Sequence, residues 1–174
     1  EPYMGIKSED LKNILSHFPS GVTIVTTNVL GKVHGTTISA FSAVSIDPPL
    51  ILICVDQDSE INKLIIESGF FGVNFLKSGQ GLLSDMLAAK ELDPDHTIND
   101  GVSLLGGNPF TLGKTGSPIF DENLAYLECS VHSTVITGDH TIYIGEVENG
   151  DVSSSNDEPL IYFKRKYRAI NLDS

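Results

Sequence analysis

The sequence predicts a mainly β protein, an antiparallel β-barrel with two or three α-helices at its periphery. Three observations favour this class: many short runs of β-branched and aromatic residues, turn-rich connections between them, and a second half without a steady helical pattern. A doubly wound α/β fold needs a helix between most strands, which the second half does not supply. We therefore expect a barrel that closes through antiparallel strands.

The N-terminal segment predicts one helix followed by a hairpin. Ser8 and the acidic residues after it precede apolar side chains at helical spacing, so an N-capped amphipathic helix is expected to end near Pro19. Residues 21–27 (GVTIVTT) and 33–39 have the composition of strands, and a turn around Gly31 is expected to join them.

A buried strand, a helix and another strand are expected next. The continuously apolar residues 50–55 (LILICV) follow two prolines, and their length fits a central strand better than a helix. Asp58 or Ser59 can cap a helix that Gly69 ends. Residues 70–76 (FFGVNFL) then predict a strand.

The remaining chain divides into a helix, an irregular excursion and further strands. Residues 82–90 are expected to be helical, whereas residues 91–118 are rich in Gly, Pro, Asp and Asn and predict a long lid or wrapping loop. The β pattern then resumes, with strands expected at 125–136, 141–147 and 160–163.

Length and charge limit the class of protein. The 174 residues suit a single domain, residues 1–174, with a real core and little room for a second domain. Eleven basic against 23 acidic residues give a net charge of −12, which argues against a nucleic-acid partner. No run is long and apolar enough for a membrane span, and the acidic N-terminus is unlike a secretory signal.

The two cysteines favour a reducing, cytoplasmic environment. Cys54 and Cys129 lie far apart, each within an apolar segment, and lack the spacing of a zinc or redox motif. Buried free thiols are the expected state of both.

The stretch from Gly35 to Asp56 (GTTISAFSAVSIDPPLILICVD) is dense in hydroxyl groups between two expected strands. Hydroxyls and backbone N–H groups placed in this way can bind a phosphate or a ring carbonyl. By composition alone the stretch more simply predicts an edge strand that faces water, so both interpretations stay open at this point.

Motifs of other chemistry fail on their spacing. The sequence GKT at 113–115 resembles the end of a phosphate-binding P-loop, but Asn108 stands where that motif requires glycine. No GxGxxG, nucleophile elbow or close metal-ligand pair is present. Two features remain. One is His140 directly after a Gly-Asp turn, where a loop can present a functional side chain. The other is the run KRKYR at 164–168, which is usual for a solvated strand end but is also the natural place for a phosphate-bearing group in so acidic a chain.

Five segments resemble the flavin reductase-like family, in order and over nearly the whole chain. They are FPSGVTIVTT at 18–27, HGTTISAFSAVSIDPPLILICVD at 34–56, SGFFGVNFL at 68–76, GDHTIYIGEV at 138–147 and PLIYFKRKYR at 159–168. The resemblance implies a Greek-key, FMN-binding split β-barrel. It also implies an NAD(P)H:flavin oxidoreductase that transfers a hydride from NADH or NADPH to FMN or FAD.

The resemblance also implies the site residues. It places the flavin phosphate against the hydroxyl-rich loop and, through the helix N-terminus, near Ser59 and Asn62. It places His140 beside the nicotinamide, as the one residue expected to act in catalysis. The flavin contacts that it implies are Thr37, Ser39, Ala40, Phe41, Cys54, Val55, Asp56, Ser59, Asn62, Asn74 and Tyr167, with those from Cys54 to Asp56 made largely through backbone atoms.

Two departures from the family pattern leave alternatives open. Ala40 stands where many members have a second polar side chain, and Asp85-Met86-Leu87 stands where many have an arginine pair, with Lys90 the nearest base. The choice between FMN and FAD therefore stays open. The resemblance further implies a homodimer and a partner flavin-dependent monooxygenase. A non-enzymatic flavin-binding electron carrier is the alternative, and a barrel without any cofactor is a weaker third.

Overall fold

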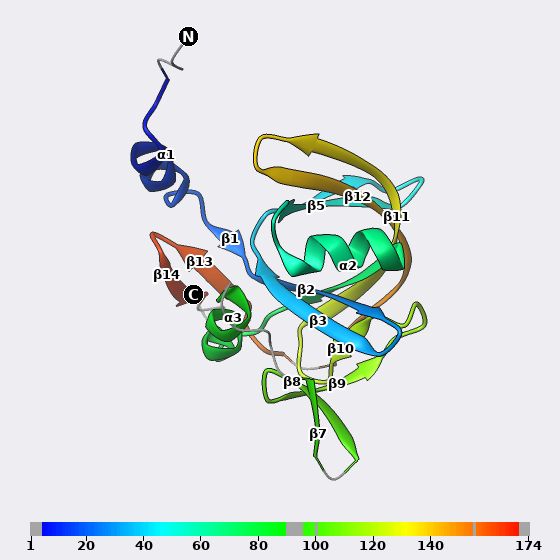
Figure 1. The fold of residues 1–174 in the computed structure, drawn as a ribbon. Coiled ribbons are helices and arrows are strands. Elements are labelled where there is room, and N and C mark those ends of the chain that lie inside the picture. The colour runs from blue at the N-terminus through cyan, green and yellow to red at the C-terminus, as the bar shows by residue number, and fades with distance from the viewer. Residues whose placement is uncertain (1–4, 90–95, 100, 155, 171–174) are drawn as a thin grey trace.

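The structure is a computed structural model that describes residues 5–89, 96–99, 101–154 and 156–170. A seven-stranded antiparallel sheet in the order β3-β2-β6-β11-β12-β5-β4 curls into the barrel (Figure 1). The expected mainly β, antiparallel architecture is confirmed. The strands of this sheet are β2 (Thr23–Val29), β3 (Lys32–Ile38), β4 (Phe41–Ser45), β5 (Leu50–Asp56), β6 (Phe70–Phe75), β11 (Ala125–Thr137) and β12 (His140–Val152).

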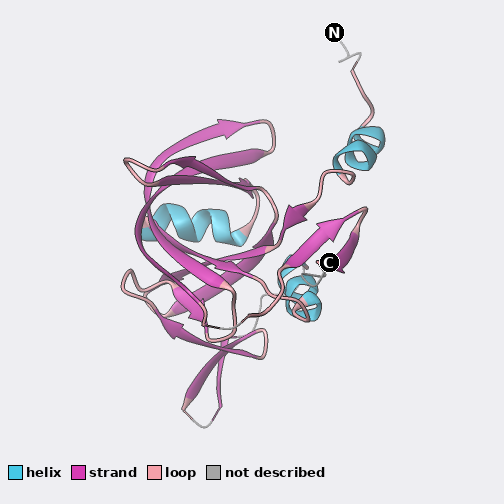
Figure 2. Ribbon diagram, turned by 180° about the vertical axis from the view of Figure 1, so that it is seen from behind, coloured by secondary structure: helices cyan, strands magenta, loops and turns pink. Residues whose placement is uncertain are grey.

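The core of the barrel lies between this sheet and helix α2 (Glu60–Ser68), which Figure 2 shows within the curve of the strands. The expected strand at 50–55 forms as β5, but it lies next to the edge strand β4 and only its alternate residues are buried, so the expected central, continuously buried position is wrong. Ile61 and Ile65 of α2 have no exposed surface. The hydroxyl of Ser59 caps α2, and Gly69, with a left-handed φ of 73°, ends it. Both helix boundaries agree with the sequence.

A second core lies beneath helix α3 (Gly81–Ala88). Leu83 and Leu87 of α3 pack in a buried cluster with Leu105, Phe110 and Phe120. Two smaller sheets surround this cluster. One has the order β1-β13-β14, with β1 (Ser20–Gly21), β13 (Leu160–Phe163) and β14 (Lys166–Ala169); the other has the order β10-β9-β8-β7, with β7 (His96–Asn99), β8 (Val102–Leu105), β9 (Asn108–Leu112) and β10 (Pro118–Phe120).

The expectation of an irregular loop over residues 91–118 is wrong for most of that segment. Its described residues form β7 to β9 and the start of β10. Each strand is only three to five residues long. The turns between them contain Gly101, Gly106 and Gly107, all with positive φ. Strands this short show no alternation that a sequence pattern can detect. Strand β4, within the hydroxyl-rich stretch, lies at the edge of the sheet with exposed residues, as the simpler interpretation of that stretch predicted.

Helix α1 (Ser8–Leu15) is shorter than expected and is capped differently. Lys7 is its N-cap, without a side-chain cap bond, so Ser8 is not the cap. After Leu15 the hydroxyl of Ser16 donates to the Asn13 carbonyl at 2.7 Å, and the chain turns toward Pro19. At α3 the expected end, Lys90, lies outside the described residues. Among the helices that the structure describes, none is long and apolar enough to cross a membrane.

Candidate functional site

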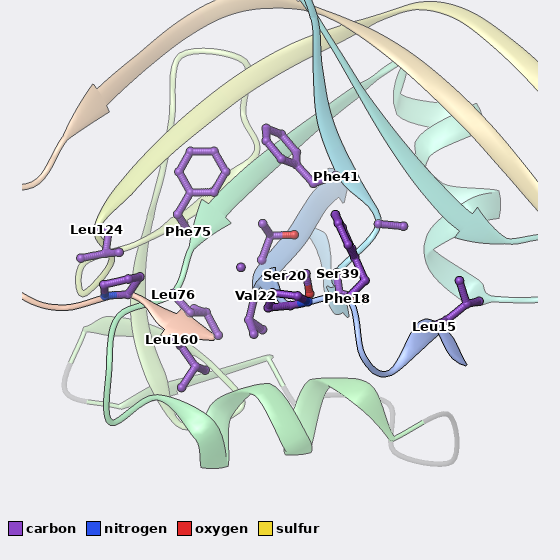
Figure 3. Close-up of a pocket in the computed structure, with 15 residues that line it drawn as sticks. Leu15, Phe18, Ser20, Val22, Ser39, Phe41, Phe75, Leu76, Leu124 and Leu160 are labelled. Carbon is purple, nitrogen blue, oxygen red and sulfur yellow. The ribbon is translucent and has the colours of Figure 1, made fainter. Parts of the chain in front are cut away.

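A pocket of about 710 Å³ opens where the two cores meet. Figure 3 shows Phe41 and Phe75 on one side of it, Phe18 on another, and Leu76 and Leu160 toward α3. Mainly apolar walls with a few polar groups are typical of small-molecule sites of this size. The lining residues are Leu15, Phe18, Pro19, Ser20, Gly21, Val22, Thr23, Ser39, Ala40, Phe41, Phe75, Leu76, Leu124, Pro159 and Leu160.

The loop between β3 and β4 brings three predicted residues into this pocket. Ser39 and Ala40 are exposed there, and the Phe41 ring meets the Phe75 ring edge-on at 5.2 Å between centroids. The backbone N–H of Cys54 donates to the Ala40 carbonyl at 3.1 Å. This hydrogen bond fixes the loop against β5, although no residue of β5 itself lines the pocket.

The end of β5 joins the start of α2 through its own hydrogen bonds. The Ser59 hydroxyl donates to the Asp56 carbonyl at 2.6 Å and accepts from the Asn62 N–H at 3.3 Å. The Asn62 side chain is buried, where its oxygen accepts from the Tyr143 hydroxyl at 2.5 Å. Val55 is also buried, so any contact that it makes in a pocket falls to its backbone. The end of β5 therefore presents mainly backbone groups, and it leads directly into the N-terminus of α2.

His140 lies at the same end of the sheet, opposite Asp56 in the β5–β12 register. The side chain of Gln57 donates to the carbonyls of Gly138 at 3.0 Å and His140 at 3.2 Å, which ties the turn to β5. Asp139 Oδ1 lies 2.7 Å from His140 Nδ1. This hydrogen bond is the main reason why the pKa of Asp139 is lowered. The contact orients an imidazole that is 44% exposed.

Tyr167 and Thr37 meet at helix α3 instead of in the pocket. The Tyr167 hydroxyl lies 2.8 Å from Ser84 Oγ and 2.7 Å from Asp85 Oδ1, and burial raises the pKa of this phenol. The Thr37 hydroxyl donates to the Ser84 carbonyl at 2.6 Å. Thr36 makes a similar bond to the Leu87 carbonyl at 3.2 Å. Part of the hydroxyl-rich stretch therefore holds α3 to β3.

Asn74 has no exposed surface and bonds within the protein. Its side-chain oxygen accepts from the Phe120 N–H at 2.9 Å, and its nitrogen lies 3.4 Å from the Pro118 carbonyl. These bonds attach β10 to β6. Like Val55 and Asn62, the predicted residue Asn74 therefore lies inside the protein, and its side chain contacts β10 rather than the pocket.

The two cysteines are unpaired and protonated near neutral pH. Burial raises the pKa of the Cys54 thiol, and burial with two nearby glutamates raises that of Cys129 to about 12. The described residues also hold no group of three or more His, Cys, Asp or Glu side chains that could bind a metal ion. Neither cysteine lines the pocket at the Ser39–Phe41 loop.

Several lining residues were missed when the sequence was considered alone. Phe18, Ser20 and Val22 belong to the first segment that carries the family resemblance, and Pro159 and Leu160 to the last, but neither segment has an obvious chemical motif. The local sequence signal at Phe18 is that it continues the helical spacing of Leu11 and Leu15, just before Pro19.

A family model described as the flavin reductase like domain matches residues 15–171, which is nearly all of the chain. The chain belongs to the flavin reductase-like family. A flavin reductase (NADH) of Kitasatospora aureofaciens is 34% identical over 164 residues, covering 93% of this chain and 81% of that protein. An NADH-dependent flavin reductase of a Rhodococcus species is 31% identical over 165 residues, covering 93% and 86%.

Solved structures of flavin reductases share the fold of this family member. The NADH:FAD oxidoreductase of Streptomyces globisporus, in complex with NAD and FAD fragments, has a TM-score of 0.83 at 29% identity and covers 98% of both chains. The flavin reductase component of a bacterial two-component tryptophan halogenase has a TM-score of 0.84 at 30% identity, covering 94% of this chain and 98% of that one. The expected split barrel is thereby confirmed.

Proposed function

We propose that this protein is an NADH-dependent flavin reductase, which transfers a hydride from the nicotinamide to FMN or FAD. The observation that carries the proposal is the aromatic-walled pocket at the Ser39–Phe41 loop, in a chain whose relatives are named NADH-dependent flavin reductases. The same relatives favour an enzyme over an electron carrier.

The residues of the pocket fit a flavin ring. Its volume of about 710 Å³ and its walls of Phe41, Phe75, Leu76 and Leu160 suit a planar apolar ring system. Ser39 and the backbone of the loop supply polar groups for the ring edge. When bound, flavin and nicotinamide supply the hydride chemistry themselves. The protein has only to exclude water and to hold the two rings in contact.

The phosphate and the nicotinamide would be held at the end of β5. The N-terminus of α2, with the Ser59 hydroxyl, favours an anionic group through its backbone N–H groups and dipole. His140, oriented by Asp139, would position the nicotinamide without exchanging a proton in the hydride step. Tyr167 would act through Ser84 and α3.

Nicotinamide oxidation tests this function. We expect NADH to be consumed by the purified protein only when FMN or FAD is added, and NADPH to be consumed more slowly. In His140→Ala we expect slower hydride transfer, by on the order of 10- to 100-fold, with unchanged flavin affinity. His132→Ala, an exposed histidine of the same hairpin, is the matched control. Flavin-independent oxidation, or none with either nucleotide, would contradict the proposal.

A partner that consumes the reduced flavin belongs to the same proposal. Relatives include proteins named reductase subunit of a flavin-dependent monooxygenase in Mycobacterium tuberculosis and reductase component of 4-hydroxyphenylacetate 3-monooxygenase in Thermus thermophilus. We infer a cytoplasmic homodimer that delivers reduced flavin to such an oxygenase. Light scattering on the purified protein measures the oligomeric state, and a monomer would remove the dimer from the proposal.

A further inference from the structure

Helix α1 has an apolar side that the structure leaves uncovered. Leu11, Ile14 and Leu15 are all exposed, and no residue of the helix is buried. Phe18, directly after the helix, is 78% exposed. An eight-residue helix is not stable on its own, so α1 depends on contacts with the rest of the molecule.

The contacts that hold α1 are made with the β13–β14 hairpin and are largely polar. The N–H of Lys164 donates to the Ser16 carbonyl at 2.7 Å, and the His17 ring meets the Phe163 ring edge-on at 6.4 Å. Arg165 pairs with Glu9 at 3.8 Å. These contacts hold both ends of α1 against the hairpin but leave Leu11, Ile14 and Leu15 exposed.

The direction so fixed brings Phe18 to the pocket at the Ser39–Phe41 loop. Phe18 and Leu15 line this pocket, whereas Leu11 and Ile14 do not. Figure 3 shows the Phe18 ring beside Ser39, across the pocket from Leu124. Most of a large aromatic side chain is thus exposed at the edge of a cavity whose other walls are already apolar.

We propose that Phe18 is a flavin-binding residue, whose ring packs against the flavin ring system in this pocket and which the α1–hairpin contacts hold in position. The proposal rests on the proposed function, because it requires a flavin in the pocket. It explains why so large an apolar side chain stays exposed in the protein alone, since the bound ring would bury it. The competing occupant of the apolar side of α1 is a second copy of this chain.

Titration with FMN and with riboflavin tests the proposal, because riboflavin has the ring system without the phosphate. We expect Phe18→Ala to weaken the binding of both by the same factor, about tenfold. Phe18→Tyr should keep wild-type affinity. Ile14→Ala is the matched control, since Ile14 lies on the same apolar side outside the pocket, and its affinities should be unchanged. Binding is followed by flavin fluorescence, independently of turnover.

Three outcomes would overturn the proposal. The first is that Phe18→Ala binds both flavins as tightly as the wild type does. The second is that Ile14→Ala weakens binding as much as Phe18→Ala, and a loss of dimer in both variants would then assign the apolar side of α1 to a second copy. If the wild-type protein binds neither flavin, the proposed function fails with it. Circular dichroism confirms that each variant is folded, which the exposure of Phe18 leads us to expect.

Discussion

At the scale of single residues, Glu128 shows how the sequence GKT is used in this fold. Its carboxylate has no exposed surface and accepts from the N–H and the hydroxyl of Thr115, both at 2.8 Å, and from the Asn149 amide at 2.7 Å. A Cβ at Gly113 would come within 2.2 Å of this carboxylate. The GKT loop thus surrounds an internal carboxylate in place of a phosphate.

The charge of Glu128 should stabilise the protein. Burial raises the pKa of this carboxyl, but the hydrogen bonds from Thr115, Asn149 and Lys114 outweigh burial, and the net pKa is lowered. We expect Glu128→Gln to lower the free energy of unfolding by about 1–3 kcal/mol, because the new amide nitrogen would face the donor of Asn149. Urea denaturation measures the change, and Glu67→Gln, at an exposed position of α2, is the control.

The pH dependence of this variant has a definite sign. A carboxyl whose folded pKa is lowered stabilises the protein above its unfolded pKa, and this contribution is lost as the pH falls through the folded pKa. The difference in the free energy of unfolding between wild type and Glu128→Gln should therefore be largest above pH 4.5, the ordinary pKa of glutamate, and should decrease below it. A difference that widens toward acid pH would contradict the role assigned to the charge.

At the scale of elements, the two ends of helix α2 are explained by local sequence, whereas those of α1 are not. Ser59 and Gly69 supply a side-chain cap and a left-handed C-cap to α2. Ser8 has the same local preference, but the structure begins α1 one residue earlier, at an uncapped Lys7. An N-cap residue must itself have an extended backbone, and here Lys7 is extended whereas Ser8 is already helical, so the Ser8 hydroxyl is one residue too late to cap α1.

The cap of α2 gives a prediction about both stability and binding. Ser59→Ala should lower the free energy of unfolding by about 1 kcal/mol, because the Asn62 N–H loses its partner. The substitution should also weaken the binding of FMN more than the binding of riboflavin, because only FMN has a phosphate that the helix N-terminus can bind. Ser8→Ala, at the helix without a side-chain cap bond, should change neither quantity. An equal loss of affinity for FMN and for riboflavin would contradict the binding of the phosphate at the N-terminus of α2.

At the scale of the whole molecule, strand β12 packs closely over the barrel core at a position where it carries no side chain. Gly145 of β12 lies against Phe71, and a Cβ there would come within 2.5 Å of the Phe71 ring and 3.0 Å of Cys129 Cβ. Phe71 and Cys129 belong to the buried core of the barrel and have no exposed surface. The close packing of β12 over this core therefore depends on the glycine.

The close packing of β12 against Phe71 can be tested by adding one methyl group at Gly145. Gly145→Ala should lower the free energy of unfolding by about 1–3 kcal/mol, because the ring of Phe71 has to move within a packed core. Thermal unfolding followed by circular dichroism is the measurement. Gly21→Ala is the matched control, since a Cβ at that strand position meets no atom within 4 Å. A Gly145→Ala protein as stable as the wild type would show that the core accommodates the methyl group.

The sequence alone predicted much of the fold because most of its long elements have strong local patterns. The apolar run at 50–55 is the strand β5, though only alternate residues of it are buried. The long β11–β12 hairpin lies where β-branched residues predicted it, with β12 five residues longer than expected at its C-terminal end. The strands β7 to β10 could not be predicted, since each is short, and β8, β9 and β10 pack against Leu83 and Leu87 of a helix elsewhere in the chain. The glycines in the turns between these short strands made the whole segment resemble an irregular loop.

The sequence by itself determined the family, the strands of the barrel, the capped helix α2 and the position of His140 after its Gly-Asp turn. These depend on residues close together in the chain. Only the tertiary structure decided that the Thr37 hydroxyl holds α3, that Asn74 bonds β10, and that Phe18 lies in one pocket with Phe41 and Leu160. Hydrogen-bond partners and pocket walls come from segments far apart in sequence, and only the closed barrel brings them together.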